Sequence, residues 1–189
     1  MQLATYTHST DLRVGVVVGA QVVDLAAALA QRGHDPVPAS SMLAFLAAGE
    51  AVLPLAQAAV EAALRDGDPA LVQPLAGVKL AAPLPCPGKL LCLAGNYAEH
   101  IQEGGGVFVG KEKMIPRFFM KPCTSIIATG EAIRIPPSTG FADWELELAV
   151  VIGKTGRDLT PQQAAEHIAG YTIFNDISAR ELTFRQGLP

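Results

Sequence analysis

The stretch Asp143-Trp-Glu-Leu-Glu-Leu-Ala-Val-Val-Ile-Gly153 alternates polar and apolar residues and then becomes an apolar run that ends at a glycine. Alternation at every second residue is typical of a β-strand, in which successive side chains point to opposite faces. Asp143, Glu145 and Glu147 are therefore predicted to share one face, and the apolar run is predicted to be buried. Neighbouring carboxylates repel each other, and their burial is costly without a compensating cation. The pattern favours a metal or catalytic site, although a solvated face of an amphipathic strand produces the same alternation.

The bulk composition is that of a globular protein. Of the 189 residues, 50% are hydrophobic and 17% are charged, which suits one sizeable domain or a small domain with part of a larger one. The net charge is −4 and the basic residues are scattered, which argues against a nucleic-acid or membrane-surface partner. No apolar run reaches the ~18 residues of a membrane span. Three sparse cysteines without a Cys-x-x-Cys pair are expected to be reduced thiols of a cytoplasmic protein.

The first part of the chain predicts a small α+β domain without a cluster of chemically reactive groups. Strands and helices are expected over residues 2–6, 13–18, 21–24, 25–31, 40–45 and 53–65, with Asp24 as a helix cap. A proline-rich stretch then indicates a boundary between two modules. We therefore expect an N-terminal domain over residues 1–72, a linker over 73–88 and a second module over 89–189.

The second module is expected to contain further β-strands. They are predicted over residues 90–93, 118–121, 124–127, 132–135 and 171–177, in addition to the acidic strand. Asp176 and Arg180 follow the apolar part of the last of these runs. Arg180 is the best-placed permanent cation to grip a carboxylate through a two-pronged hydrogen bond.

A short helical segment carries a histidine and a glutamate. His100 and Glu103 are three residues apart, so on a helix they face the same side and can form a hydrogen bond. A carboxylate that holds a histidine fixes its tautomer and raises its basicity, which a general base requires, but such pairs are also common on solvated helices. Residues 104–117 follow and begin with three glycines, which suits either a mobile lid or a plain surface loop.

Four motifs follow one another in a fixed order. They are Gly95-Asn-Tyr-Ala-Glu-His100 with Glu103, Phe119-Met-Lys-Pro122, the acidic strand through Gly153, and Gly170-Tyr-Thr-Ile-Phe-Asn-Asp-Ile-Ser-Ala-Arg180. As an ordered set they resemble the fumarylacetoacetate hydrolase family, strongly over residues 88–185 and loosely before them. The resemblance implies an α+β fold in which a mixed β-roll catalytic domain, incomplete at the C-terminus, is preceded by a small α+β N-terminal domain.

The resemblance also implies a divalent metal ion in the site. The matching positions assign Glu145, Glu147 and Asp176 as its ligands. The implied ion is Mg²⁺ or Mn²⁺, with Ca²⁺ as a further choice, and hard carboxylate oxygens suit all three. In such a site the metal chelates an oxo-carboxylate and acts as a Lewis acid.

The implied activity is a metal-dependent hydrolase or lyase that cleaves a C–C bond in small 2-oxo or 1,3-dicarbonyl acids of acylpyruvate type. His100 and Glu103 match the dyad that serves as the catalytic base, and Lys121 matches a further catalytic position. Tyr97 and Arg180 match positions that contact substrate. The family also implies a homodimer and a role in aromatic catabolism.

Other interpretations stay open. A decarboxylase or isomerase of oxo acids would use the same scaffold. A silent or truncated member would act only as a metal-binding or assembly module, and a generic α+β domain with an amphipathic acidic strand would have no such site. Thr183 stands where the family commonly has glutamine, and residues 104–117 form a longer loop than in short members. The family continues beyond this point into strands with a catalytic lysine, so the sequence is expected to be a fragment.

Overall fold

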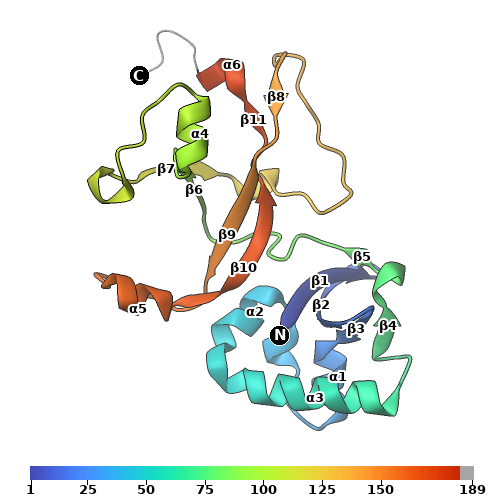
Figure 1. The fold of residues 1–189 in the computed structure, drawn as a ribbon. Helices are drawn as coiled ribbons and strands as arrows, with labels where there is room; N and C mark the ends of the chain where they lie inside the picture. The colour runs from blue at the N-terminus through green and yellow to red at the C-terminus, as the bar shows by residue number, and fades with distance from the viewer. Residues whose placement is uncertain (184–189) are drawn as a thin grey trace. The chain divides into compact units, whose positions relative to one another are not determined.

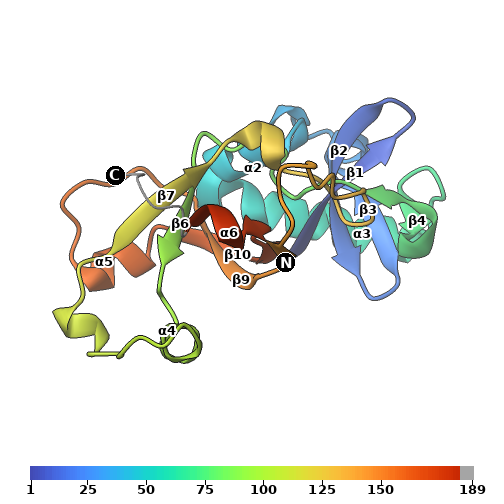
Figure 2. The same cartoon turned by 90° about the horizontal axis from the view of Figure 1, so that it is seen from above.

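The structure, a computed structural model, describes residues 1–183. It divides into two compact units, one formed by Met1–Pro83 with Ala128–Pro189 and the other by Leu84–Ile127. Both units combine helices with antiparallel strands, and Figures 1 and 2 show these elements from two directions. The expected α+β class is therefore confirmed. The domain limits at residues 72 and 88 stay a prediction.

The N-terminal part contains a five-stranded antiparallel sheet with the order β4-β3-β2-β1-β5. Its strands are β1 (Gln2–His8), β2 (Asp11–Val18), β3 (Gln21–Asp24), β4 (Val72–Pro74) and β5 (Lys79–Leu80). The first three confirm the predicted strands. The last two are too short to show a periodic pattern in the sequence, and they are recognisable only through their pairing with β3 and β1.

Three predicted α-helices are confirmed in the same part. They are α1 (Leu25–Gln31), α2 (Met42–Ala48) and α3 (Leu53–Asp66), joined by the 3₁₀ turns η1 (Val37–Ala39) and η2 (Gly49–Val52), with η3 (Leu75–Gly77) after β4. The side chain of Asp24 caps α1 by accepting from the Ala27 N–H at 2.9 Å. The side chain of Ser41 caps α2 by accepting from the Ala44 N–H at 3.1 Å. Both caps satisfy backbone donors that a helix start leaves without a partner.

The buried apolar residues of the described chain all lie between Tyr6 and Leu71. Leu25 and Leu29 of α1 and Val23 of β3 are at most 1% exposed. Figure 1 shows α1 and α3 beside the strands of this sheet. Sheet and helices therefore bury one shared core, as a small layered domain requires.

Asp24 is a buried charge inside this core, with only 4% of its surface exposed. Its Oδ2 accepts from the Tyr6 hydroxyl at 3.0 Å and from Arg13 Nη1 at 2.9 Å. Burial raises the pKa of the Tyr6 hydroxyl, and the neighbouring Asp24 carboxylate raises it further. The carboxylate thus compensates its burial through a helix cap, a hydroxyl and a guanidinium.

One helical stretch, Met42–Asp66, is long and apolar enough to cross a membrane by length and composition, with a mean hydropathy of 1.7. It is interrupted at Gly49, where φ is 66°. One face of its α3 part carries the buried residues Ala56, Ala59, Val60, Ala62 and Ala63. Core helices of globular domains pass the same test of length and composition, and 28% of the apolar window of this stretch is buried.

The Leu84–Ile127 unit is built on one antiparallel strand pair. β6 (Leu90–Ala94) pairs with β7 (Arg117–Lys121), from Leu90 opposite Lys121 to Ala94 opposite Arg117. The predicted short helix is α4 (Ala98–Glu103), and 3₁₀ turns occur at η4 (Lys111–Lys113) and η5 (Cys123–Ser125). The strands predicted over residues 90–93 and 118–121 and the predicted helix are confirmed.

The last part of the described chain contains two further antiparallel pairs. They are β9 (Leu146–Ile152) with β10 (Ile168–Asn175), and β8 (Ala142–Asp143) with β11 (Ser178–Ala179). Figure 1 shows β9 and β10 as a long curved ribbon. The helix α5 (Pro161–Ala165) begins with a capping box between Thr160 and Gln163, and α6 (Arg180–Thr183) follows β11.

The strands predicted over residues 124–127 and 132–135 are wrong. The carbonyl of Pro122 accepts from both the backbone N–H (3.0 Å) and the hydroxyl (2.8 Å) of Ser125, which closes the turn η5 instead. Ile133 and Ile135 are 47% and 56% exposed. Within residues 1–183 neither segment pairs with a strand, and β-propensity without a partner does not form a sheet.

Candidate metal and acid–base site

The predicted acidic strand is interrupted where its second carboxylate lies. β8 ends at Asp143 and β9 begins three residues later. The paired stretch of the chain is also interrupted here, between the end of β10 at Asn175 and the start of β11 at Ser178. The Asp176 N–H donates to the Glu145 carbonyl at 2.8 Å, and the Glu145 N–H donates to Asn175 Oδ1 at 3.3 Å. The interruption therefore places Glu145 and Asp176, which are distant in sequence, next to each other.

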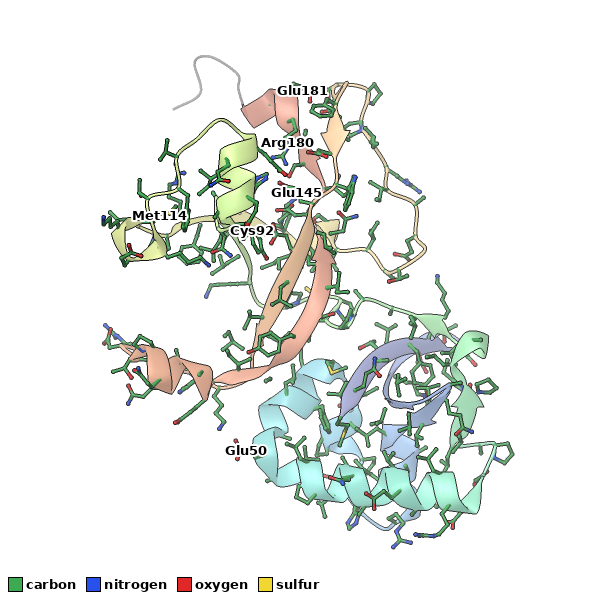
Figure 3. All side chains as sticks on the ribbon, in the orientation of Figure 1. Glu50, Cys92, Met114, Glu145, Arg180 and Glu181 are labelled. Atoms are coloured by element: carbon green, nitrogen blue, oxygen red, sulfur yellow. The ribbon has the colours of Figure 1, made fainter. Side chains whose placement is uncertain are left out.

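A guanidinium binds the acidic residues at this point. Arg180 Nε donates to Asp143 Oδ2 at 2.9 Å, and Arg180 Nη2 donates to Glu145 Oε1 (Figure 3). The Ser178 hydroxyl donates to the second oxygen, Glu145 Oε2, at 2.9 Å. The hydrogen bond with Asp143 raises the pKa of Arg180, although partial burial opposes the shift. Among these residues, the positive charge of Arg180 thus compensates the repulsion between the carboxylates of the acidic strand, although Arg180 was predicted to contact the substrate.

Asp176 and Glu147 occupy different environments. Asp176 is 3% exposed, whereas Glu147 lies opposite Phe174 on β9 and is partly exposed. Among residues 1–183, no three His, Cys, Asp or Glu side chains already converge as a metal-binding group. The ligand set Glu145, Glu147 and Asp176 therefore stays a prediction.

The donor chemistry of these residues nevertheless fits a hard divalent cation. Glu145 and Asp176 are adjacent through a backbone hydrogen bond, and Glu147 is two residues from Glu145 in the sequence. Because Arg180 already donates to Glu145 Oε1, a metal ion at this oxygen would compete with the guanidinium for the same carboxylate. Site formation would then be an exchange of one cation for another.

The prediction that the apolar run of the acidic strand is buried is wrong, because Ala149 and Val151 are only partly buried and their even-numbered neighbours are exposed. Val150 and Ile152 are 47% and 64% exposed, and Leu148 is 59% exposed. Opposite them on β10, Tyr171 and Ile173 are 62% and 76% exposed. A two-stranded ribbon leaves a face uncovered unless another layer packs on it, and within residues 1–183 none buries this one.

The predicted catalytic base His100 and its partner Glu103 lie in the Leu84–Ile127 unit, on α4. His100 Nδ1 is 3.8 Å from Glu103 Oε2, which is an electrostatic contact and is longer than a hydrogen bond. The two side chains are 44% and 78% exposed. Tyr97 lies at the N-cap position of α4, and Lys121 ends β7 opposite Leu90. The helix therefore brings the pair to one side as predicted, and the catalytic and substrate-binding roles of these residues stay predictions.

The glycines after α4 have a defined structural role. Gly105 has φ of 77°, a conformation that side chains disfavour. A Cβ at Gly106 would lie 2.9 Å from Ile101 Cγ2 and 3.1 Å from the Ile101 carbonyl, so the chain turns tightly against the helix end. Residues 107–116 contain one 3₁₀ turn, η4, as their regular structure. The lid function of this loop stays a prediction.

Sequence analysis did not identify Ser178, Thr139 or Glu181 as contributors to the site. Glu181 Oε1 accepts from the Thr139 hydroxyl at 2.7 Å and from the Gly140 N–H at 2.8 Å, which ties the loop before β8 to α6. The hydrogen bond from Thr139 lowers the pKa of Glu181. Ser178 lies within the recognised motif and Glu181 directly follows it, and these positions were the available signal. The side chain of Thr183 lies outside the described residues.

Both sets of candidate residues fall within one family match. Residues 89–189, more than half of the chain, match the family model described as fumarylacetoacetate (FAA) hydrolase C-terminal. The chain belongs to the fumarylacetoacetate hydrolase family. The resemblance drawn from the four ordered motifs is thereby confirmed.

Relatives and solved structures agree with this assignment. A human protein named oxaloacetate tautomerase FAHD2B, mitochondrial, is 40% identical over 154 residues, which are 81% of this chain and 46% of the relative. A fumarylacetoacetate hydrolase from Exiguobacterium antarcticum has a TM-score of 0.69 at 28% identity, over 97% of this chain and 58% of its own. Maleylpyruvate hydrolase from Sphingobium sp. SYK-6, in complex with manganese(II) and pyruvate, has a TM-score of 0.67 at 29% identity, over 95% of this chain and 60% of its own. The fold is that of this family, and the chain spans about half the length of the curated relatives it matches.

Proposed function

We propose that this protein is a divalent-metal-dependent enzyme that acts on small 2-oxo acids of acylpyruvate type. The observation that carries the proposal is the backbone hydrogen bond between Asp176 and Glu145, where the β8–β11 pair and the β9–β10 pair are both interrupted. Arg180 donates to the Glu145 carboxylate there and compensates its charge. The human relative's name specifies oxaloacetate, and the manganese-containing neighbour is a maleylpyruvate hydrolase with pyruvate bound. Oxaloacetate, maleylpyruvate and pyruvate share the 2-oxo-carboxylate group, which is why we assign that group to the substrate.

Glu145, Glu147 and Asp176 are the residues that would hold the metal ion. A bound Mg²⁺ or Mn²⁺ would supply Lewis-acid stabilisation of the negative charge that develops on the 2-oxo group. Ser178 orients Glu145 through its hydroxyl, so it has the role of a supporting group for a ligand. Mn²⁺ has support from the manganese(II) complex of the maleylpyruvate hydrolase, and the choice between the two ions is part of the test.

His100 would act as the base that moves a proton at the carbon next to the 2-oxo group. In tautomerisation it removes the proton from this carbon, and a proton is then delivered to the oxo oxygen to give the enol. Glu103 would orient the imidazole and stabilise its protonated form. Lys121, Tyr97 and Arg180 would bind the oxygens of the substrate.

Two reactions can start from such proton transfer. Tautomerisation of oxaloacetate is the first to test because a relative that is 40% identical is named for this activity. Hydrolytic C–C cleavage of an acylpyruvate, with His100 activating water, is the second, since the neighbour named as a hydrolase is 29% identical. Decarboxylation is a third outcome on the same scaffold, and a silent member would bind metal without turnover.

The experiment measures both reactions with purified protein. The conversion of the enol form of oxaloacetate to its keto form is followed by ultraviolet absorbance, as is the cleavage of an acylpyruvate. Both are measured in Mg²⁺, in Mn²⁺ and in excess chelator. Turnover should require metal and fall by about 10²–10⁴-fold in His100→Gln, the usual contribution of a general base. Glu145→Gln should abolish it, whereas the matched exposed substitution Glu166→Gln should preserve it. Metal binding without turnover of either substrate would reject the proposed catalytic function in favour of the silent alternative.

The proposals on assembly and location are separate from the chemistry. A homodimer is proposed from family membership, and sedimentation of the purified chain tests it. The cytoplasmic location also stays a proposal, and the human relative's name places that protein in mitochondria.

A further inference from the structure

Two cysteines that are distant in sequence meet in the Leu84–Ile127 unit. The side chains of Cys86 and Cys123 lie within hydrogen-bonding reach of each other, and this contact raises the pKa of Cys86. Cys86 is exposed, Cys123 is partly exposed, and both are free thiols. The sequence had suggested only sparse, reduced cysteines, because nothing in the spacing of residues 86 and 123 indicates proximity.

The strand register explains independently why these cysteines are close. Antiparallel pairing places Leu90 of β6 opposite Lys121 of β7. Cys86 lies four residues before Leu90, and Cys123 lies two residues after Lys121, so both leave the same end of the ribbon. The third cysteine, Cys92, is within β6 opposite Phe119 and therefore belongs to the ladder itself.

Both cysteines are held on stiff backbone. Pro85 and Pro87 flank Cys86, and Pro122 precedes Cys123. Proline fixes φ, so little backbone freedom remains to be lost when two such residues are joined. The carbonyl of Pro122 also accepts two hydrogen bonds from Ser125, which secures the turn that begins at Cys123.

We propose that Cys86 and Cys123 are a redox modification site that forms a reversible intramolecular disulfide. The oxidant is a small-molecule disulfide of the glutathione class. One protein thiolate attacks it, forms a mixed disulfide and releases one small thiol; the second protein thiolate attacks the protein sulfur of the mixed disulfide and releases the other small thiol. The protein loses two electrons and two protons, and the small disulfide gains them.

The bond would close a loop over residues 86–123, which contains α4 with His100 and Glu103. None of the residues of the Leu84–Ile127 unit is fully buried, so its own packing constrains it weakly. A cross-link at the open end of β6 and β7 limits separation of the two strands. This inference goes beyond the proposed function and does not depend on it, because its readout is covalent.

The sequence makes the test direct, since trypsin separates the three cysteines. Cleavage after Lys79, Lys89, Lys111, Arg117 and Arg134 yields peptides 80–89, 90–111 and 118–134, with one cysteine each. The full chain is equilibrated in buffers of reduced and oxidised glutathione at several ratios, quenched with acid, alkylated and digested. We expect peptide 80–89 linked to peptide 118–134 in oxidising buffers, released by reductant, with Cys92 alkylated throughout.

Matched variants and a dilution series complete the design. Cys86→Ser and Cys123→Ser should each lose the linked peptide, and Cys92→Ser should keep it. The yield of linked monomer should not change with protein concentration, because the reaction is intramolecular. Full alkylation of all three cysteines at every ratio, a link through Cys92, or a link found only between chains would overturn the proposal.

Discussion

The N-terminal part of the chain and the β9–β10 ribbon use similar apolar residues with opposite results. Leu29 and Val23 in the N-terminal part are 1% and 0% exposed, whereas Leu148 and Ile173 in the ribbon are 59% and 76% exposed. Five strands with helices beside them bury a common core. Two strands alone leave a face open to solvent.

This difference separates the source of stability from the candidate chemistry. Apolar burial stabilises the N-terminal part, where no reactive cluster was predicted. The acidic site is organised instead by polar contacts: Arg180 and Ser178 hold Glu145, and Glu181 holds the loop at Thr139. We therefore expect substitutions in the first region to change global stability and those in the second to change ion binding and local structure.

The largest effect should come from removing a buried leucine. Leu29→Ala should lower the free energy of unfolding by about 2–5 kcal/mol, because it leaves a cavity in the core. The matched change Leu148→Ala, at an exposed position, should alter it by less than about 0.5 kcal/mol. Urea denaturation followed by circular dichroism measures both, and equal losses would remove the contrast between the regions.

A buried carboxylate should have the next largest effect. Asp24→Ala removes the α1 cap together with the acceptor for Tyr6 and Arg13, which should cost about 2 kcal/mol. Glu61→Ala, on the exposed side of α3, serves as the control and should cost little. If the two variants unfold at the same urea concentration, the buried network does not contribute as described.

A smaller effect is expected for the guanidinium of the acidic site. Arg180→Gln should leave the unfolding free energy nearly unchanged but tighten Mn²⁺ binding by about fivefold, since a partly exposed competing cation contributes about 1 kcal/mol. Arg157→Gln is the matched control, because Arg157 is 92% exposed. Weaker Mn²⁺ binding in Arg180→Gln would show that the guanidinium supports the ion instead of competing with it.

The smallest effect is a local dependence on pH. The hydrogen bond from Thr139 lowers the pKa of Glu181 in the folded state, so its contribution is present above the unfolded pKa and is lost as pH falls through the lower folded pKa. The amide resonance of Gly140, which donates to Glu181, should report this titration with a midpoint below the ordinary glutamate value of about 4.3. Glu181→Gln should abolish that titration, and a midpoint at or above the ordinary value would contradict the contact.

Sequence reasoning was most successful where the signal is local. Asp24 caps the helix that its position predicted, and α4 carries His100 and Glu103 on one side. These features depend on neighbours within a few residues, which a single sequence displays.

The features that sequence reasoning missed depend on distant partners. The interruption at Glu145 arises from pairing with the chain near Asp176, and the role of Arg180 toward Asp143 depends on the same register. The contact between Cys86 and Cys123 requires the pairing of β6 with β7. None of these pairings has a sequence period that would reveal it.

The central claim is that Glu145, Glu147 and Asp176 bind a divalent ion, and Mn²⁺ binding followed by electron paramagnetic resonance tests it most directly. The wild-type chain should bind one Mn²⁺ per chain, as should the control Glu166→Gln. Glu145→Gln, Glu147→Gln and Asp176→Asn should each weaken binding by about tenfold or more, since each removes a charged oxygen ligand. Equal Mn²⁺ affinity in the wild type and all three ligand variants would contradict the account.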